Sequence, residues 1–396
     1  MKILVVTQYF WPEEFRINDI CKGLKEAGHD VEVLTGLPNY PEGKIYKGYS
    51  WIKKGVKEYN GIKIMRVPMI PRGKNSSMML ALNYVSFMVN ASLKALTLIG
   101  KKYDRVFVFQ VSPITSAVPA IILSKLKKIP SYIYIQDLWP ETFYSIINIK
   151  NKKIRSKMKN ICNKIYNSFD KLLIASKGYE DILLKEGFKE NKFEYFPQWA
   201  EDFYSESLNE ISENRIFTVT FAGNIGKAQS VDTIIEAANL AKENKNIKWQ
   251  IIGDGSEFEN IKNLVKKYSL ESTVDLLGRK PAKDMPKYFS SSDGLIVTLK
   301  DEDILRVTLP AKVQSYMAAG KPIIAALSGE GNRIIKESKS GLVGEAEDYK
   351  ALYENVIKLY NMNENEKKCI GFNGKTFFEE NFTKNKLLNQ LEIIMS

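Results

Sequence analysis

The fold class of this chain is indicated first by residues 309–324, which read LPAKVQSYMAAGKPII. Proline at a first helical position wastes no backbone donor and glycine readily ends a helix, so Pro310 and Gly320 are expected to bracket a short helix. The apolar run at 323–327 that follows is typical of a buried strand. Lys312 adds a charge to a helix start with unpaired amides, which suits a phosphate or diphosphate. An ordinary helix-to-strand turn would give the same pattern, so other segments must decide.

The length and composition are those of a globular protein with more than one domain. The 396 residues are enough for two or three domains, and 44% apolar with 26% charged residues is ordinary for a soluble chain. Cys21, Cys162 and Cys369 lie far apart without a CxxC spacing, so neither a zinc site nor a disulfide framework is indicated. The apolar run after Lys2 is too short for a signal-peptide core. We therefore expect a reduced, cytoplasmic protein.

Strand and helix patterns alternate twice along the chain. In the first half, strands are expected at 2–7, 31–35, 62–68, 105–110, 131–136, 171–175 and 193–196, and helices near 16–28, 76–100, 115–127, 151–168 and 177–186. In the second half, strands are expected at 217–222, 249–252, 274–277, 294–299 and 322–327, and helices near 230–244, 256–268, 281–291, 311–319, 331–338 and 348–361. This alternation predicts two doubly wound, Rossmann-like α/β domains, with a ligand cleft at the carboxyl ends of both parallel sheets.

The predicted domains are residues 1–200 and residues 201–375, joined through the polar stretch 205–215. The remaining segment, residues 376–396, is expected to be helical. It either closes the second domain or crosses back to the first.

The formal charge of +12 is concentrated in the first half. Residues 1–200 hold 32 basic against 17 acidic residues, and residues 201–396 hold 26 against 29. The basic half suits an anionic membrane, a nucleic acid or a phosphorylated substrate, although a solvated basic surface would look the same.

Two glycine turns follow expected strands in the second half. The first reads FAGNIGKAQ at residues 221–229, where Gly223 and Gly226 let the backbone approach a ligand and Lys227 supplies charge. The second reads IIGDG at residues 251–255. Neither is a complete GxGxxG or a Walker loop, so P-loop kinase chemistry is excluded.

Acid–base chemistry must come mainly from carboxylates. His29 is the only histidine and lies in an expected helix-to-strand turn, so a Ser-His-Asp triad or a histidine-rich metal site has no support. The remaining candidates follow strands: Glu13 and Glu14 after the first, and Asp137 and Glu141 after the fifth.

Four segments together carry a family resemblance. They read TQYFWPEEFRIND at 7–19, GLPNYPEG at 36–43, QDLWPE at 136–141, and PAKVQSYMAAGKP at 310–322. In this order they resemble the retaining GT-B glycosyltransferases of family 4, and more narrowly the capsule and O-antigen branch that transfers N-acetylfucosamine-type sugars. The resemblance covers nearly the whole chain. It implies a UDP-sugar held mainly by the second domain and a polyprenyl-diphosphate-linked saccharide held mainly by the first, with no cofactor, no metal and no nucleic-acid partner.

The chain departs from the pattern of this family at several positions. The Arg and Lys of the family's diphosphate clamp fall at Asn224 and Gln229, and its paired glutamates fall at Val307 and Ser315. The active-site histidine of many relatives is replaced by Gln136. The resemblance therefore leaves the ribose contact unassigned. Lys227, which lies between Asn224 and Gln229, is the expected substitute cation of the diphosphate clamp.

The resemblance and the strand-end positions together assign three groups of site residues. Expected catalytic residues are Asp137, Glu141, Lys227 and Lys312. Expected donor-binding residues are Gly223, Asn224, Gly226, Gln229, Gly253, Asp254, Arg279, Pro310 and Val313. Expected acceptor-side residues are Glu13, Glu14, Arg16, Asn18 and Trp139. Cations and helix N-termini aimed at the diphosphate would stabilise the leaving group, and the acceptor hydroxyl would attack from the leaving-group face.

Two other functions fit the same architecture. A nucleotide-sugar epimerase needs acid–base groups on both faces of the sugar, against which the single histidine argues. A catalytically inactive, membrane-associated assembly subunit could be built on a degenerate transferase fold.

One apolar segment indicates work at a membrane surface. Residues 76–99 carry Lys94 as their only charge, and their polar residues make spanning unattractive, so an interfacial or buried helix is expected. Basic residues surround it in sequence: Lys53, Lys54, Lys57, Arg72, Lys74, Lys152, Lys153, Arg155, Lys157, Lys159 and Lys164. We expect peripheral association with the anionic inner face of the cell membrane. The alternative is a core helix with solvated lysines nearby.

Overall fold

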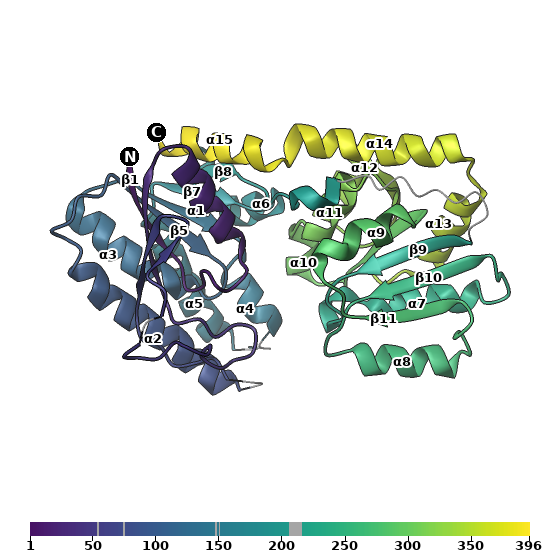
Figure 1. The fold of residues 1–396 in the computed structure, drawn as a ribbon, viewed down its shortest axis with the longest axis horizontal. Helices are drawn as coiled ribbons and strands as arrows, with labels where there is room; N and C mark the ends of the chain where they lie inside the picture. The colour runs from purple at the N-terminus through teal and green to yellow at the C-terminus, as the bar shows by residue number, and fades with distance from the viewer. Residues whose placement is uncertain (54, 74–75, 147–148, 150, 206–215) are drawn as a thin grey trace. The chain divides into compact units, whose positions relative to one another are not determined.

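Two sheets organise the part of the chain that the computed structural model describes, which is residues 1–53, 55–73, 76–146, 149, 151–205 and 216–396 (Figure 1). Unit 1 contains Met1–Ala175, Tyr179–Phe196 and Leu388–Ser396, and unit 2 contains Ser176–Gly178 and Pro197–Leu387. Residues 206–215 of the expected linker lie outside the described residues, as do Lys54 and Lys74.

The sheet of unit 1 has the strand order β3-β4-β2-β1-β5-β6-β7-β8. Its strands are β1 (Lys2–Val6), β2 (Asp30–Thr35), β3 (Glu58–Tyr59), β4 (Ile62–Arg66), β5 (Arg105–Gln110), β6 (Ser131–Ile135), β7 (Lys171–Ile174) and β8 (Phe193–Tyr195). All neighbours pair in parallel except β3, which pairs antiparallel with β4. The expectation of a purely parallel sheet is therefore wrong at this edge. Asn60 and Gly61 both have positive φ, 49° and 74°, and so close a two-residue hairpin.

The helices of unit 1 follow the predicted alternation, with one addition. They are α1 (Arg16–Glu26), α2 (Ser77–Leu96), α3 (Val118–Lys127), α4 (Glu141–Ile146), α5 (Lys152–Asn167) and α6 (Gly178–Lys185), with short 3-10 turns η1 (Ile114–Ala117) and η2 (Glu190–Lys192). The sequence analysis did not predict α4. The helix is only six residues long, too short to show a helical period.

The end of the chain packs on unit 1 through α15 (Lys384–Met395). Arg105 donates to the carbonyl of Met395 at 2.9 Å, and His29 lies 3.2 Å from the carboxylate of Glu392. The close contact of Leu388 with Gly23 leaves no space for a side chain at position 23. The single histidine therefore has a structural contact, and the last residues of the chain complete unit 1.

Unit 2 has an all-parallel sheet with the order β11-β10-β9-β12-β13-β14. Its strands are β9 (Phe217–Ala222), β10 (Ile247–Ile252), β11 (Val274–Gly278), β12 (Gly294–Thr298), β13 (Ile323–Ala326) and β14 (Gly341–Gly344). This is the strand order 3-2-1-4-5-6 of a Rossmann fold. The prediction of two Rossmann-like α/β domains is confirmed. The last strand was missed because its four residues include two glycines, which disfavour strands in isolation.

Helices cover both faces of this sheet and bury its strands. They are α7 (Val231–Leu240), α8 (Phe258–Lys267), α9 (Met285–Ser290), α10 (Asp303–Val307), α11 (Ala311–Ala318), α12 (Glu330–Glu337), α13 (Tyr349–Asn361) and α14 (Glu364–Asn381), with 3-10 turns η3 (Asp202–Ser205), η4 (Lys227–Gln229) and η5 (Ala282–Asp284). Two apolar clusters result: Phe221 and Ile251 belong to one, and Ala222 and Ile252 belong to the other. This alternation explains why β12 and β13 carry apolar residues at successive positions.

The helix that was expected from residues 309–324 is α11. Pro310 stands one position before the helix, with φ −68° and ψ 131°, and the helix begins at Ala311, as the predicted range 311–319 has it. Gly320 has φ 63° and ends it, as expected. The strand order of unit 2 reverses between β9 and β12, and open α/β sheets bind ligands at such a reversal.

Candidate active site

Two glycine turns approach each other closely at the carboxyl ends of β9 and β10. Gly223 has φ 144° and Gly253 has φ 151°, values that L side chains rarely adopt. A Cβ atom on Gly253 would collide with the carbonyl oxygen of Gly223, and a Cβ atom on Gly223 would collide with the side chain of Lys312. Both glycines are therefore required for the turns and the lysine to come together.

Lys312 is held at this point without a counter-ion. Its amine donates a hydrogen bond to Oε1 of Gln229 and lies 4.0 Å from the ring centroid of Phe221. Among the described residues no carboxylate forms an ion pair with it. Because burial disfavours the charged form, the pKa of Lys312 is lowered from 10.5 to about 7. A buried cation of this kind has its charge restored most readily by an anionic ligand.

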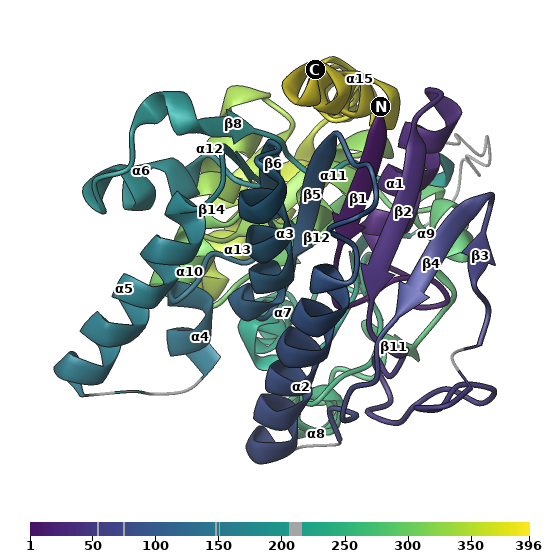
Figure 2. The same cartoon turned by 90° about the vertical axis from the view of Figure 1, so that its left-hand side faces the viewer.

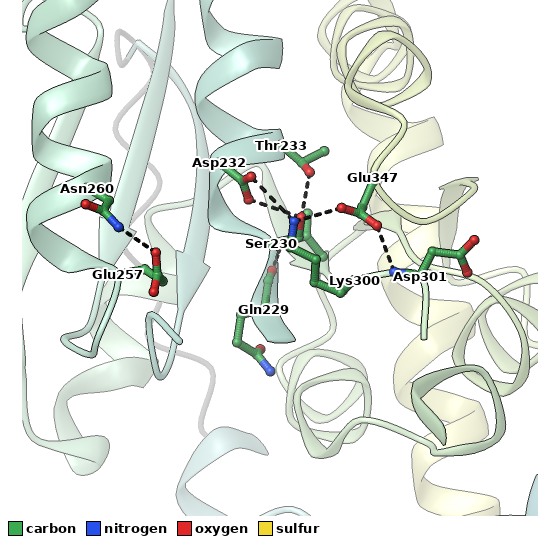
Figure 3. Close-up of polar contacts among 10 residues, drawn as sticks. Gln229, Ser230, Asp232, Thr233, Glu257, Asn260, Lys300, Asp301 and Glu347 are labelled. Carbon is green, nitrogen blue, oxygen red and sulfur yellow. Dashed lines mark hydrogen bonds and ion pairs between the residues drawn. The ribbon is translucent and has the colours of Figure 1, made fainter. Parts of the chain in front are cut away.

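The expected substitute cation, Lys227, lies elsewhere in the same region. It is exposed and lines a cavity of about 370 Å³ beside the N-terminal ends of α7 and α8. In Figure 3, Lys300 lies between Glu347 and Asp232, and its amine is 2.8 Å from the first and 3.7 Å from the second. The hydroxyl of Ser230 donates to Asp232 at 3.1 Å. No described contact joins Lys227 to Lys312, so the two predicted cations are separate features.

The other residues that are predicted to bind the sugar donor lie either in the two glycine turns or on the exposed surface. The carbonyl of Asp254 accepts from Ile225 N–H at 2.9 Å and so ties the two turns together, while the side chain of Asn224 lies against Gly226. Arg279 is exposed, directly after β11.

One predicted backbone donor is already used within α11. The N–H of Val313 donates to the carbonyl of Pro310 at 3.0 Å. Val313 is one of the predicted donor-binding residues, and its backbone N–H is hydrogen-bonded within the first turn of the helix.

In unit 1, Asp137 follows β6 by two residues and so lies at the carboxyl end of that strand. Its carboxylate accepts from the hydroxyl of Ser112 at 2.8 Å, and that hydroxyl accepts from Nε1 of Trp139 at 3.1 Å. Burial raises the pKa of Asp137 above its ordinary value. A buried carboxylate that is held in position by a hydrogen bond and has a raised pKa is suited to accept a proton from a hydroxyl.

Two glutamines that the sequence analysis did not assign lie at neighbouring strand ends. Gln110 is the last residue of β5 and donates through Nε2 to the carbonyl of Asp137 at 3.0 Å. Gln8 follows β1 by two residues and donates through Nε2 to Asn83 at 2.7 Å. Within the described chain, Oε1 of each is buried without a hydrogen-bond partner. Since buried polar atoms are almost always paired, a ligand hydroxyl is the natural partner for these oxygens.

Both glutamines lie at the end of an expected strand, and this position could have identified them from the sequence. Strands β1 and β5 are adjacent, with Val6 opposite Val108, and the strand order of unit 1 reverses between them. Both glutamines therefore lie where a Rossmann sheet binds ligands.

Glu13 and Asn18 hold a loop in place. Oε1 of Glu13 accepts from the backbone N–H groups of Asn39 and Tyr40, each at 2.8 Å. Burial raises the pKa of Glu13 to about 7 despite these hydrogen bonds. Asn18 accepts from Trp11 N–H at 3.0 Å and donates to the carbonyl of Glu13 at 2.7 Å. Glu13 therefore shapes the loop after β2, and Asn18 shapes the loop after β1.

The remaining acceptor-side candidates differ in position. Glu14 is exposed, and Arg16 lies 3.8 Å from Asp19 on the first turn of α1. Within the described residues, no contact joins either of them to the carboxylate of Asp137.

Trp139 and Glu141, which follow Asp137 along the chain, have different surroundings. Trp139 is 8% exposed and its ring stacks on Phe143 at 5.0 Å, so little of its face is open to a sugar. Its indole instead orients Ser112. Glu141 begins α4, where burial raises its pKa and Lys159 of α5 is its main cationic neighbour. The two residues thus support the site from different sides.

The described residues contain no group of three or more His, Cys, Asp and Glu side chains arranged to hold a metal ion.

The second half of the chain is similar to a known protein family. Residues 205–375 match the family model described as glycosyl transferases group 1. This match covers most of unit 2. The region of the match includes both glycine turns and Lys312.

Two proteins to which this chain is similar are named as glycosyltransferases. WbjE of Pseudomonas aeruginosa is 27% identical over 225 residues, 53% of this chain and 54% of that protein, so the match spans about half of the relative. WcaI of Escherichia coli K12, named as a colanic acid biosynthesis glycosyl transferase, is 23% identical and matches 81% of this chain and 82% of its own length. Both relatives are named as glycosyltransferases, and the name of WcaI adds colanic acid biosynthesis.

A solved structure extends the comparison to the fold of both units. HepE of Anabaena, solved in complex with UDP and glucose, superposes with a TM-score of 0.70 at 16% identity, covering 100% of this chain and 99% of that chain. The chain therefore has the GT-B fold of two Rossmann-like domains.

Proposed function

We propose that this protein is a retaining, metal-independent glycosyltransferase of family 4, which moves a sugar from a UDP-sugar to a polyprenyl-diphosphate-linked saccharide in capsule or O-antigen synthesis. The group 1 match and the names of WbjE and WcaI support the transferase activity and its connection with polysaccharides. The complex of HepE with UDP and glucose supports the donor class. An N-acetylfucosamine-type donor rests on the resemblance of the four sequence segments.

The observation that carries the proposal is the buried amine of Lys312 beside Gly223, which forms no ion pair with a carboxylate among the described residues. Cleavage of a sugar–diphosphate bond places negative charge on the leaving diphosphate. A diphosphate beside Lys312 would favour the ammonium form, and Gln229 would hold that ammonium in position. Because Gly223 and Gly253 carry no side chains, the two turns can approach each other and Lys312 can lie against Gly223.

Unit 1 supplies chemistry that suits an acceptor saccharide. Asp137 is held by Ser112 and would take the proton of the attacking hydroxyl. The unpaired oxygens of Gln8 and Gln110 would accept hydrogen bonds from other hydroxyls of the acceptor. Attack from the leaving-group face would retain the anomeric configuration without a covalent intermediate.

The direct test is product analysis with a panel of UDP-sugars and a polyprenyl-diphosphate-linked saccharide. Mass spectrometry should show one sugar added to the acceptor, in the presence of EDTA as well as without it. NMR of the anomeric proton should show the configuration of the donor. Conversion of the UDP-sugar to an isomer without acceptor would indicate an epimerase instead, and the absence of any turnover would favour an assembly subunit.

A further inference from the structure

Helix α2 carries two apolar faces, of which the protein covers only one. Its buried residues are Asn83, Phe87, Ala91 and Ala95. A second row, which we call the α2 stripe, recurs every three or four residues on the opposite side and consists of Met78, Leu82, Val85, Val89, Leu93 and Leu96. Members of the stripe are 42–71% exposed. A surface helix of a soluble protein normally presents polar residues on that side.

The exposed apolar surface continues onto neighbouring helices. Helix α2 packs against α3, and η1 touches α2, α3 and α5, so that these helices lie on one face of the unit 1 sheet (Figure 2). Leu126 of α3 is 55% exposed, and Ile154 and Ile161 of α5 are about half exposed. Contiguous apolar surface of this kind marks an interaction site.

The charged residues of helices α2, α3 and α5 are all basic, although Glu186 pairs with Lys159 of α5. Helices α2, α3 and α5 contain no acidic residue. Lys94 is the one charged residue of α2, α3 contributes two lysines, and α5 contributes six basic residues. On α5 the exposed Ile154 and Ile161 are surrounded by these basic residues. Apolar side chains among basic residues are the pattern of a helix that lies at an anionic membrane surface.

We propose that the α2 stripe and the basic residues of α3 and α5 form a docking surface for an anionic lipid bilayer. Helix α2 lies in the plane of the membrane, with its stripe below the headgroups. Its length and composition would allow it to span a bilayer. However, the side chain of Asn83 donates to the carbonyl of Ile70 at 2.6 Å and Phe87 is fully buried, so the other face of α2 is anchored in unit 1.

A second copy of the chain is a poorer occupant for the same surface. A symmetric dimer places the same patch of both subunits together. The basic residues of α3 and α5 would then face their own copies, and like charges repel. An anionic bilayer instead attracts each basic residue by about 1 kcal/mol.

The test is co-sedimentation of the full chain with vesicles of equimolar phosphatidylglycerol and phosphatidylcholine. We expect binding at low salt and partial retention at about 1 M NaCl, where charges are screened beyond ~3 Å but inserted apolar side chains still hold. A variant with Val85→Glu and Val89→Glu should bind at least ~10-fold more weakly, since charged side chains do not enter the apolar layer. Replacing Lys152, Lys153 and Arg155 by glutamine should weaken binding at low salt only.

Matched controls keep the result specific to the surface. Leu240→Glu and Phe372→Glu change residues of unit 2 that are 45% and 69% exposed, and should leave vesicle binding unchanged. Circular dichroism should show that every variant is folded. In a Cys369→Ser background, an environment-sensitive fluorophore on Val89→Cys should shift to shorter wavelength when vesicles are added.

Three results would overturn the proposal. The first is that the natural protein does not bind the vesicles at low salt. The second is that the variant with Val85→Glu and Val89→Glu binds the vesicles as strongly as the natural protein does. The third is sedimentation of the protein alone as a dimer that the stripe variant abolishes, which would make a second copy the occupant. None of these measurements depends on transferase activity, so the membrane proposal and the proposed function fail separately.

Discussion

Replacing Lys312 by methionine should make the protein more stable and, at the same time, a poorer ligand binder. Burial lowers the pKa of Lys312 from 10.5 to about 7. Each pKa unit corresponds to ~1.36 kcal/mol, so keeping this lysine buried costs up to ~4 kcal/mol of unfolding free energy at neutral pH. Methionine has a similar length and no charge. Allowing ~1 kcal/mol for the lost hydrogen bond to Gln229, we expect a net gain of ~3 kcal/mol.

The pH dependence of this gain has a definite sign. Between pH 7 and 10.5 the unfolded chain keeps the proton of Lys312 while the folded chain has lost it. Since the unfolded state binds more protons, the natural protein gains stability as pH rises through this range. The methionine variant lacks the group and lacks this contribution. The difference between the two proteins should therefore be largest at neutral pH and shrink toward about pH 10.

Calorimetry and urea unfolding would measure the effect. For a unit of this size, ~3 kcal/mol corresponds to a rise in Tm of about 6–12 °C. Binding of UDP-glucose, measured by titration calorimetry, should fall by ~10²-fold or more. Lys227→Met is the matched control, because this exposed lysine should change unfolding free energy by less than ~0.5 kcal/mol. A Lys312→Met variant that is less stable at neutral pH, or a stability difference that is constant with pH, would refute the reasoning.

Three further outcomes are expected. Gly253→Ala should destabilise unit 2 by ~2–4 kcal/mol in thermal unfolding, because its Cβ would meet the Gly223 carbonyl at a φ of 151°; an unchanged Tm would contradict this. Asp137→Asn should lower turnover by ~10²-fold or more while UDP affinity stays within about twofold, and an equal loss of affinity would give Asp137 a structural role. Burial raises the pKa of Glu13 to about 7, so the folded state binds more protons and loses stability as pH rises from ~4.5 to 7. Glu13→Gln should accordingly raise the unfolding free energy by ~3 kcal/mol at pH 8 but not at pH 4; equal effects at both pH values would count against this account.

The sequence by itself determined the fold class and the order of the elements. Buried parallel strands must be apolar on both faces, so β9 and β13 stand out as short apolar runs between helical periods. The prolines and glycines around α11 located its ends within one residue, because their backbone preferences are local. Elements with weak local signals were missed: β3, β14, α4 and α10 each have two to six residues.

The candidate site was predictable only in part, for a related reason. Strand-end positions led to Gly223 and Asp137 at the carboxyl edges of the two sheets, since chain order specifies where each strand ends, and the expected helix start at Pro310 led to Lys312. The sequence could not show which side chains meet. Lys312 was matched with Lys227 because both are cations, whereas folding places it beside Gln229, 83 residues away.

Only the tertiary structure decided the partners and burial of the polar groups. The unpaired oxygens of Gln8 and Gln110 arise because β1 and β5, about a hundred residues apart in the chain, become neighbours in the sheet. The role of Glu13 as a loop anchor depends on the backbone of Asn39 and Tyr40 in the same way. Hydrogen bonding and desolvation depend on distances of a few ångströms, which residue types and spacing along the chain do not specify.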